Sequence, residues 1–329
     1  MSSSSGSTDT RPRTGSPPAA STAAPNPGLP GTVTTHRKAR PQRRPHWFGW
    51  LCLAPYLVLL VAFGLGPAGY AVYESLADPE HIGPAGGAAY VRVFSDFRFL
   101  PALGNVSLFM ALYLPVMVVG VLLLALVVQE QRASYGAGLR LVYMLPGAVT
   151  GSASVLLWYV MLQPSLSPFG PALRAMGQET GTDVFQQSHL VVIFALMAFT
   201  TGFGQWVVIM YGALQGVPRD LLEAARMDGA SWWQTAWRVK LPLISKYVVY
   251  MLILAFTAGL QIFIEPQLLY GIAFVGSKSW SLNQLGLLFA FDNGDFAAAA
   301  ALCLMMLAVC ATGAVLLVTR AKFFDTEVE

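Results

Sequence analysis

Residues 216–242 read GVPRDLLEAARMDGASWWQTAWRVKLP, and the local signals in this stretch decide how the chain is organised. Asp220 precedes Glu223 by three residues, which is the spacing of a capping box and predicts a helix that starts at Leu221. Gly229 suits the left-handed position that closes a helix. The stretch is therefore expected to begin with a short helix of about two turns.

A second helix is predicted directly after the first. Ser231 and Gln234 repeat the capping-box spacing, and Pro242 stands where the next apolar run begins. Ala224 and Ala225 favour a helix and are small enough to let another protein approach closely. The local chemistry leaves two interpretations open: a projecting helix–turn–helix that a partner grips, or an ordinary amphipathic loop that lies on lipid.

Long apolar runs lie on both sides of this stretch. A bilayer core about 30 Å thick is crossed by a helix of about 20 apolar residues. Six runs are long enough, and residues 216–242 fall between the fourth and the fifth: 51–73, 104–128, 141–162, 190–214, 243–264 and 296–319. The sequence therefore predicts an all-α integral membrane protein with six transmembrane helices.

The composition supports a membrane protein. Of the 329 residues, 55% are apolar and only 11% are charged, whereas soluble domains carry about 25% charged residues. So few charges cannot make an ordinary soluble surface. A disordered chain, a collagen-like fibre and a typical cytosolic enzyme are excluded.

The basic residues predict the orientation. If the N-terminus is cytoplasmic, the inner segments hold 14 Lys and Arg and the outer loops hold four. This bias places both termini in the cytoplasm of a multi-pass protein of the cell membrane. Residues 1–45 are expected to be a disordered cytoplasmic tail that ends in a basic run beside the membrane: Arg37, Lys38, Arg40, Arg43 and Arg44. The run directly precedes an apolar segment, so we interpret it as a topology signal rather than a nucleic-acid site.

Four residues are candidates for the wall of a transport pathway. Gln205 and Trp206 lie in the fourth apolar run, and Gln261 and Glu265 lie late in the fifth. Polar groups at membrane depth are costly and usually face the interior of a helix bundle. Amides and aromatic rings suit a sugar, although hydrogen bonding between helices is the simpler alternative.

The sequence shows no sign of catalysis or of a metal site. Residues 271–278 resemble a phosphate-binding loop only at first sight, because Ser277 precedes Lys278 where the pattern requires Lys before Ser or Thr. The three cysteines lie in apolar runs without CxxC spacing. We expect no catalytic residue, no metal and no cofactor bound by this chain.

One pattern in the opening stretch resembles a known family. From Glu223 to Pro242 the chain matches E-A-A-x3-G-x9-I-x-L-P, with Val239 in place of Ile. This is the EAA signature of permeases of binding-protein-dependent ABC importers. Residues 228–230 (Asp-Gly-Ala) and the pair Trp232–Trp233 also resemble the carbohydrate-importing branch.

The resemblance suggests how the chain is divided. Residues of about 100–322 resemble the five-helix core of a type I permease, and residues 51–73 look like the added first helix of the maltose-type carbohydrate subfamily. The expected parts are a tail (1–45), the first transmembrane helix with an extracytoplasmic loop (46–99), the core with its coupling loop 215–242 (100–322), and a second cytoplasmic tail (323–329).

The resemblance also implies a function. The chain would be a non-catalytic permease subunit that forms half of a carbohydrate pathway in an ABC importer. It would pair with a second permease, as a heterodimer, and receive cargo from an extracytoplasmic solute-binding protein. It would dock on a cytoplasmic ATPase dimer, which binds ATP and Mg. The implied coupling residues are Glu223, Ala224, Ala225, Asp228, Gly229, Leu241 and Pro242.

Other functions remain open at this stage. The importer could carry glycerol-phosphate, a polyamine or another small polar solute. A stand-alone channel or secondary transporter is a further alternative, but such transporters typically show internal repeats and the sequence shows no clear one. A membrane enzyme would require a cluster of catalytic side chains, and the sequence shows none.

Overall fold

The computed structural model describes residues 46–77, 86–131, 133–149 and 151–320. Every regular element in these ranges is a helix, as the composition and the apolar runs predicted. The expected tails, including the basic run before residue 45, lie outside the described residues.

Five described helices are long and apolar enough to cross a membrane: Trp50–Ser75, Phe99–Glu130, Gln187–Gln215, Trp232–Ala273 and Phe296–Arg320. Their positions agree with five of the six predicted spans. The remaining prediction, residues 141–162, corresponds to a bent pair of helices that brings the count up to six.

That third span is not one continuous helix. Helix α5 (Ala133–Ala148) and helix α6 (Ser152–Met161) meet at 98°. Pro146 lies in the last turn of α5, where it removes a backbone donor, and Gly151 adopts a φ of 59° that favours glycine. The apolar run predicted the span, but not the turn inside it.

Two helices widen into a π turn directly before a proline. The first transmembrane segment comprises α1 (His46–Leu60), the π turn η1 (Val61–Leu65) and α2 (Gly66–Ser75). Pro67 follows η1, and Pro242 follows the similar turn η2 (Ala236–Lys240). A proline ring collides with the carbonyl four residues earlier in a regular helix, and a wider turn relieves this contact.

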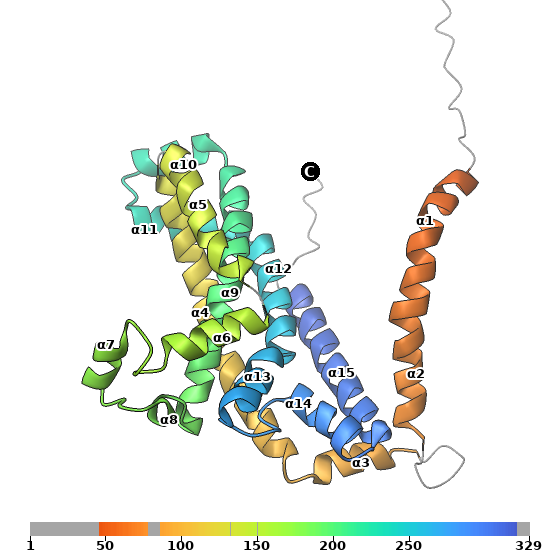
Figure 1. The fold of residues 1–329 in the computed structure, drawn as a ribbon. Coiled ribbons are helices and arrows are strands. Elements are labelled where there is room, and N and C mark those ends of the chain that lie inside the picture. The colour runs from red at the N-terminus through yellow and green to blue at the C-terminus, as the bar shows by residue number, and fades with distance from the viewer. Residues whose placement is uncertain (1–45, 78–85, 132, 150, 321–329) are drawn as a thin grey trace, which may run out of the picture. The chain divides into compact units, whose positions relative to one another are not determined.

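Four helices form the centre of the bundle. Helix α4 (Phe99–Glu130) packs on α9 (Gln187–Gln215) and α12 (Leu241–Leu260), and α12 packs on α15 (Phe296–Arg320) (Figure 1). Helix α5 lies against α9, where a Cβ at Gly204 would collide with the carbonyl of Tyr143. Glycine at position 204 therefore permits this close approach.

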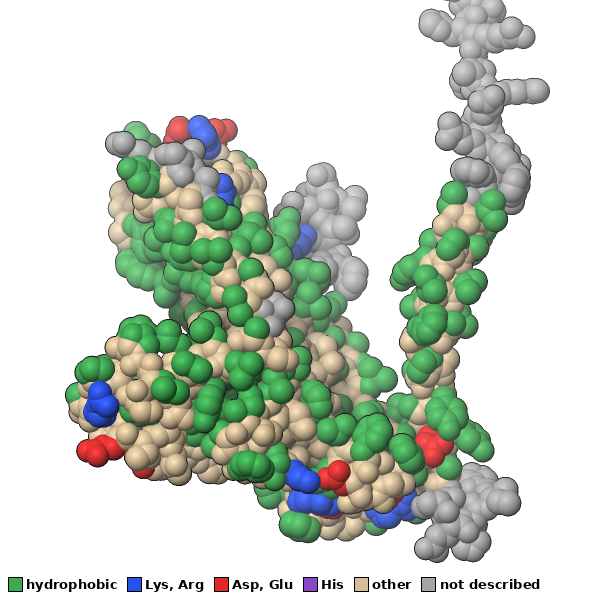
Figure 2. Space-filling model, in the orientation of Figure 1, with side chains coloured by type: hydrophobic (Ala, Val, Ile, Leu, Met, Phe, Trp, Pro, Cys, Tyr) green, Lys and Arg blue, Asp and Glu red, His purple; other side chains and the backbone are tan. Residues whose placement is uncertain are grey.

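The remaining helices lie at the two ends of the bundle (Figure 1). One end carries α10 (Arg219–Met227) and α11 (Trp232–Thr235). The opposite end carries the short elements α3 (Ala88–Ser95), α7 (Gly170–Ala175), α8 (Gly181–Val184), α13 (Ile264–Ala273), α14 (Leu282–Leu287) and the π turn η3 (Leu288–Asp292). On the face shown in Figure 2, the charged side chains of the bundle gather at these ends and the band between them is mainly hydrophobic. This distribution suits a protein whose middle is surrounded by lipid.

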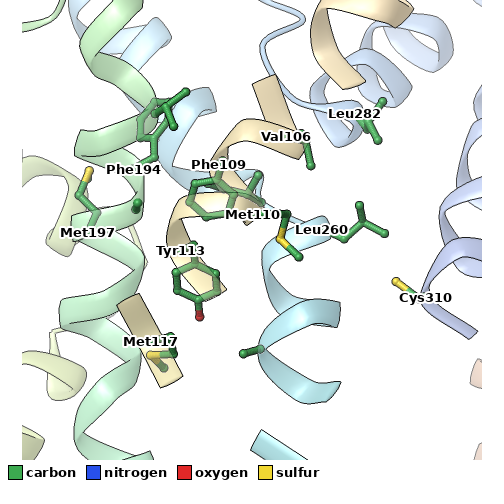
Figure 3. Packing of buried hydrophobic residues seen from close by; sticks show 14 of the residues in the cluster. Val106, Phe109, Met110, Tyr113, Met117, Phe194, Met197, Leu260, Leu282 and Cys310 are labelled. Atoms are coloured by element: carbon green, nitrogen blue, oxygen red, sulfur yellow. The ribbon is translucent and has the colours of Figure 1, made fainter. Parts of the chain in front are cut away.

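Buried apolar side chains fill the space between the central helices. Phe109 and Tyr113 of α4 stack with ring centroids 5.3 Å apart and lie between α9 and α12 (Figure 3). At the end opposite α10, Arg92 of α3 holds Asp295 through two hydrogen bonds of 2.9 and 3.1 Å. The Asp295 carboxylate also accepts the backbone N–H of Ala298, which caps the start of α15.

Candidate functional site

Helix α10 begins two residues earlier than the sequence predicted. It starts at Arg219, and the N-cap position is Pro218, with φ −58° and ψ 133°. The predicted capping box of Asp220 and Glu223 is therefore wrong. Proline already has the φ that a helix start requires, so the helix forms without a side-chain cap. Asp220 lies in the first turn instead, where a negative charge is still favourable.

The end of α10 is the turn that the sequence predicted. Gly229 has a φ of 75°, and its N–H donates to the carbonyl of Arg226 at 3.0 Å. The N–H of Ala230 donates to the carbonyl of Ala225, also at 3.0 Å. These two bonds make a Schellman turn, which satisfies carbonyls that the helix end would leave free.

The second predicted capping box is confirmed. Ser231 N–H donates to Gln234 Oε1 at 2.8 Å, and Gln234 N–H donates to Ser231 Oγ at 3.4 Å. Helix α11 starts here and continues through η2 into α12, with Pro242 in the first turn of α12. The second helix of the loop is thus the beginning of the next transmembrane segment.

Helix α10 projects from the bundle with an open outer face. Asp220, Glu223, Ala224 and Met227 are exposed, and Met227 is 88% exposed. Ala225 is half-buried, so Ala224 is the more accessible of the two alanines. Met227 was not among the predicted coupling residues, although its spacing of four residues from Glu223 places both side chains on one face of the helix.

Asp228 and Gly229 continue this exposed surface past the end of the helix. Leu241 and Pro242 lie farther along, at the start of α12, with Leu241 half-buried and Pro242 exposed. The predicted coupling residues therefore form a projecting helix, its turn and the base of the following segment.

A second feature lies within the bundle. A cavity of about 560 Å³ is lined by residues of α4, α9, α12 and α13. All four residues predicted for a pathway line it: Gln205, Trp206, Gln261 and Glu265. Tyr113 and other side chains of α4 complete the wall on one side.

The wall combines open polar groups with a packed aromatic ring. Gln205 and Gln261 are exposed and Glu265 is half-buried. Among the described residues, the side chains of these three make no hydrogen bond to another helix, so the simpler alternative of a helix–helix contact gains no support. Trp206 is 5% exposed and packs edge-on against Tyr250, with the ring centroids 5.9 Å apart. Its ring is therefore part of the wall rather than an open stacking surface.

The backbone is interrupted where it lines this cavity. Helix α12 ends at Leu260 and α13 begins at Ile264, so residues 261–263 are not helical, although the sequence predicted a continuous span over 243–264. The non-helical residues also line the cavity. Irregular backbone at membrane depth is tolerated where it faces a cavity, because unpaired carbonyls and amides can be solvated there.

Comparison with known proteins agrees with this architecture. A family described as "Binding-protein-dependent transport system inner membrane component" matches residues 84–322. The match covers most of the chain, so the protein belongs to this family.

Individual relatives are more distant. The sn-glycerol-3-phosphate transport system permease protein UgpA of Salmonella typhi is 29% identical over 221 residues, which cover 65% of this chain and 74% of that protein. The osmoprotective compounds uptake permease protein GgtC of Synechocystis sp. is 30% identical over 200 residues, with 58% and 70% covered. A solved bacterial alginate ABC transporter, in complex with an alginate pentasaccharide-bound periplasmic protein, contains a chain of the same fold. Its TM-score is 0.73 at 18% identity, and 85% of this chain and 96% of that chain are covered.

Proposed function

We propose that this chain is one permease subunit of an ABC importer for a neutral carbohydrate. The observation that carries the proposal is a projecting, exposed helix at one end of a bundle that also holds an open cavity with polar side chains on a largely apolar wall. The family requires a binding protein for transport, and the two structural features suit the two tasks of such a subunit: contact with an energy source and passage of a solute.

The contact with the energy source is assigned to α10. Glu223, Ala224, Ala225, Asp228 and Gly229 would dock in a groove of a cytoplasmic ATPase, with Leu241 and Pro242 joining the loop to the bundle. The small exposed Ala224 permits close approach, and the carboxylate of Glu223 offers a polar contact. ATP and Mg would bind to the ATPase, and this chain would bind no cofactor and catalyse no reaction.

The choice of cargo rests on the cavity. Among the described residues that line it, none is Lys or Arg, and Glu265 supplies a carboxylate. A negatively charged solute would meet no opposite charge on this wall to offset the loss of its hydration. Amides and hydroxyls suit a neutral polyol instead. Glycerol-phosphate is the second candidate, because relatives are named for sn-glycerol-3-phosphate transport.

The remaining partners follow from the same proposal. The cavity would be completed by a second, different permease, and an extracytoplasmic solute-binding protein would deliver the sugar. The bias of basic residues supports a cytoplasmic position for α10 and both termini.

The test has two parts. Gentle purification of the chain is expected to recover a second permease and an ATPase, and a homomer that transports alone would contradict the proposal. The cognate binding protein is then screened by calorimetry against maltose, trehalose, glycerol 3-phosphate and spermidine. Binding of a neutral sugar is expected, whereas selective binding of glycerol 3-phosphate or spermidine would replace carbohydrate as the cargo.

A further inference from the structure

A buried lysine lies at the base of the projecting helix. Lys240, the last residue of η2, is 5% exposed. Its ammonium donates hydrogen bonds to Gln129 Oε1 at 2.8 Å and to Glu130 Oε1 at 2.9 Å, both at the end of α4. A buried charge requires partners of this kind, because an unpaired ammonium is costly away from water.

The same partners reach two further elements. The amide of Gln129 donates to the carbonyl of Leu214 at 3.2 Å, near the end of α9. The indole N–H of Trp232 in α11 donates to Glu130 Oε1 at 3.3 Å. We call Gln129, Glu130, Trp232 and Lys240 the base cluster. It joins α4, α9 and the start of the α11–α12 segment.

Helix α10 has few contacts with the bundle. None of its residues is buried, and its half-buried Leu222 packs against the hydrophobic core. Its inner side, with Leu222 and Arg226, faces a hollow of about 390 Å³ whose other wall includes the base cluster. A force applied to α10 therefore reaches the transmembrane helices through its two ends and through Leu222, and the base cluster lies where the second end enters the bundle.

Helix α4 connects this cluster with the cavity. Glu130 is the last residue of α4, and Tyr113 of the same helix lines the cavity. The distance along the helix is about 25 Å at about 1.5 Å per residue. Helix α9 makes a second connection, since it carries both Leu214 and the cavity residue Gln205.

We propose that Lys240 is a positioning residue that locks the base of the coupling loop to α4 and α9, so that movement of α10 reaches the cavity. The proposal rests on the proposed function, because it requires an ATPase that moves α10. Without the lock, α10 would still dock, but the ends of α4 and α9 would no longer follow it.

The experiment measures the response of the cavity to ATP in the complete transporter. The background replaces Cys52, Cys303 and Cys310 with Ala, and Ala258→Cys places one thiol on the exposed cavity wall. The rate of labelling by N-ethylmaleimide is measured with and without ATP and Mg. We expect ATP to change the rate at least about fivefold in this parent.

The lock is then removed. We expect Lys240→Met and Glu130→Gln to reduce the ATP response to less than about twofold, while the ATPase still co-purifies. The exchange Lys240→Glu with Glu130→Lys is expected to restore at least about half of the parent's response. If Lys240 only stabilised the fold, its replacement would lower the ATP response of the cavity and the binding of the ATPase together. Lys246→Met is the matched control, because Lys246 is an exposed lysine of α12, the helix that continues from η2, and its response should equal the parent's.

Three results would overturn the proposal: an unchanged response in Lys240→Met, failure of the charge exchange to restore it, or loss of the ATPase in proportion to the lost response. If Lys240→Met is not recovered from the membrane, Gln129→Met decides the question. It removes the link to Leu214 while Glu130 still pairs the ammonium, and a full ATP response in that variant would contradict the lock. If the parent itself does not respond to ATP, the proposed function fails and the lock fails with it.

Discussion

Gly229 shows how one residue shapes the projecting loop. A Cβ at this position would meet no other atom within 4 Å, so space does not explain the glycine. Its φ of 75° does, because a side chain in this region costs about 1–2 kcal/mol. The residue thus acts through backbone conformation, and it directs the chain from α10 into α11.

At the residue scale, Glu223→Lys tests the docking surface. Glu223 is exposed and makes no hydrogen bond among the described residues, so the change should leave folding and membrane insertion intact. Reversal of a charge at an interface should weaken docking by about 2 kcal/mol or more. We expect solute uptake to fall by at least about tenfold, measured as uptake by cells that contain the complete transporter.

Arg238→Glu is the control for this prediction. Arg238 is an exposed charge in η2, outside α10, and its reversal tests whether any charge change in the loop has the same effect; uptake should stay near the wild-type rate. Uptake near the wild-type rate in Glu223→Lys would show that Glu223 is not a contact residue.

At the element scale, the bridge between α3 and α15 should contribute to stability. Arg92→Ala removes both bonds to Asp295, the residue that caps α15. The groups are partly exposed, so we expect a loss of about 1 kcal/mol in the free energy of unfolding. Thermal unfolding in detergent measures it.

Lys278→Ala provides the matched comparison. Lys278 and Asp292 are 3.4 Å apart, and both side chains are more than half exposed. Its removal should change stability by less than about 0.5 kcal/mol. Equal losses of stability in the two variants would show that the two hydrogen bonds of Arg92 add no more to the free energy of unfolding than the exposed pair does.

The start of α4 should be sensitive to acid. The carboxylate of Asp96 accepts hydrogen bonds from the Arg98 side chain at 2.7 and 2.9 Å, and these bonds lower the pKa of Asp96. A lowered pKa stabilises the folded state above the unfolded pKa of about 4, and this contribution is lost as the pH falls further. Asp96→Asn should therefore lower the melting temperature at pH 7.

The difference between Asp96→Asn and wild type should shrink as the pH falls below about 4. Melting curves at several pH values measure this. A difference that stays constant over the whole range would mean that the carboxylate charge does not stabilise the start of α4.

At the scale of the whole molecule, the cavity joins residues that are far apart in the chain. Gln205 lies in α9 and Gln261 in the break between α12 and α13, and both line the same space. Gln261→Leu keeps a similar volume and removes the amide. If the amide contacts the solute, uptake should fall by about fivefold or more, since a lost hydrogen bond to a polar solute is worth about 1 kcal/mol or more. ATPase co-purification should be unchanged, and unaltered uptake with unaltered selectivity would remove Gln261 from the pathway.

Several features of the fold could be predicted from the sequence because they depend on residues close together in the chain. The six apolar runs, the turn at Gly229 and the cap at Ser231 could all be predicted, because each depends on residues within a few turns of one another. In lipid a chain must satisfy its backbone hydrogen bonds within its own helix, so a long apolar run is enough to predict a span. The start of α10 could not be predicted in the same way, because Pro218 and Asp220 offer two competing helix starts.

Other features depended on tertiary structure alone. The bend between α5 and α6 and the interruption at residues 261–263 lie inside apolar runs that predict unbroken helices. The burial of Lys240 required partners 110 and 111 positions away, and the cavity required Tyr113, Gln205 and Glu265 to approach from separate helices. Local sequence was enough to predict the positions of the apolar spans, the turn at Gly229, the cap at Ser231 and the resemblance to a permease family, because these depend on local chemistry. The packing of the helices decided where the cavity lies and what holds the loop to it, because such contacts form only when distant segments lie side by side.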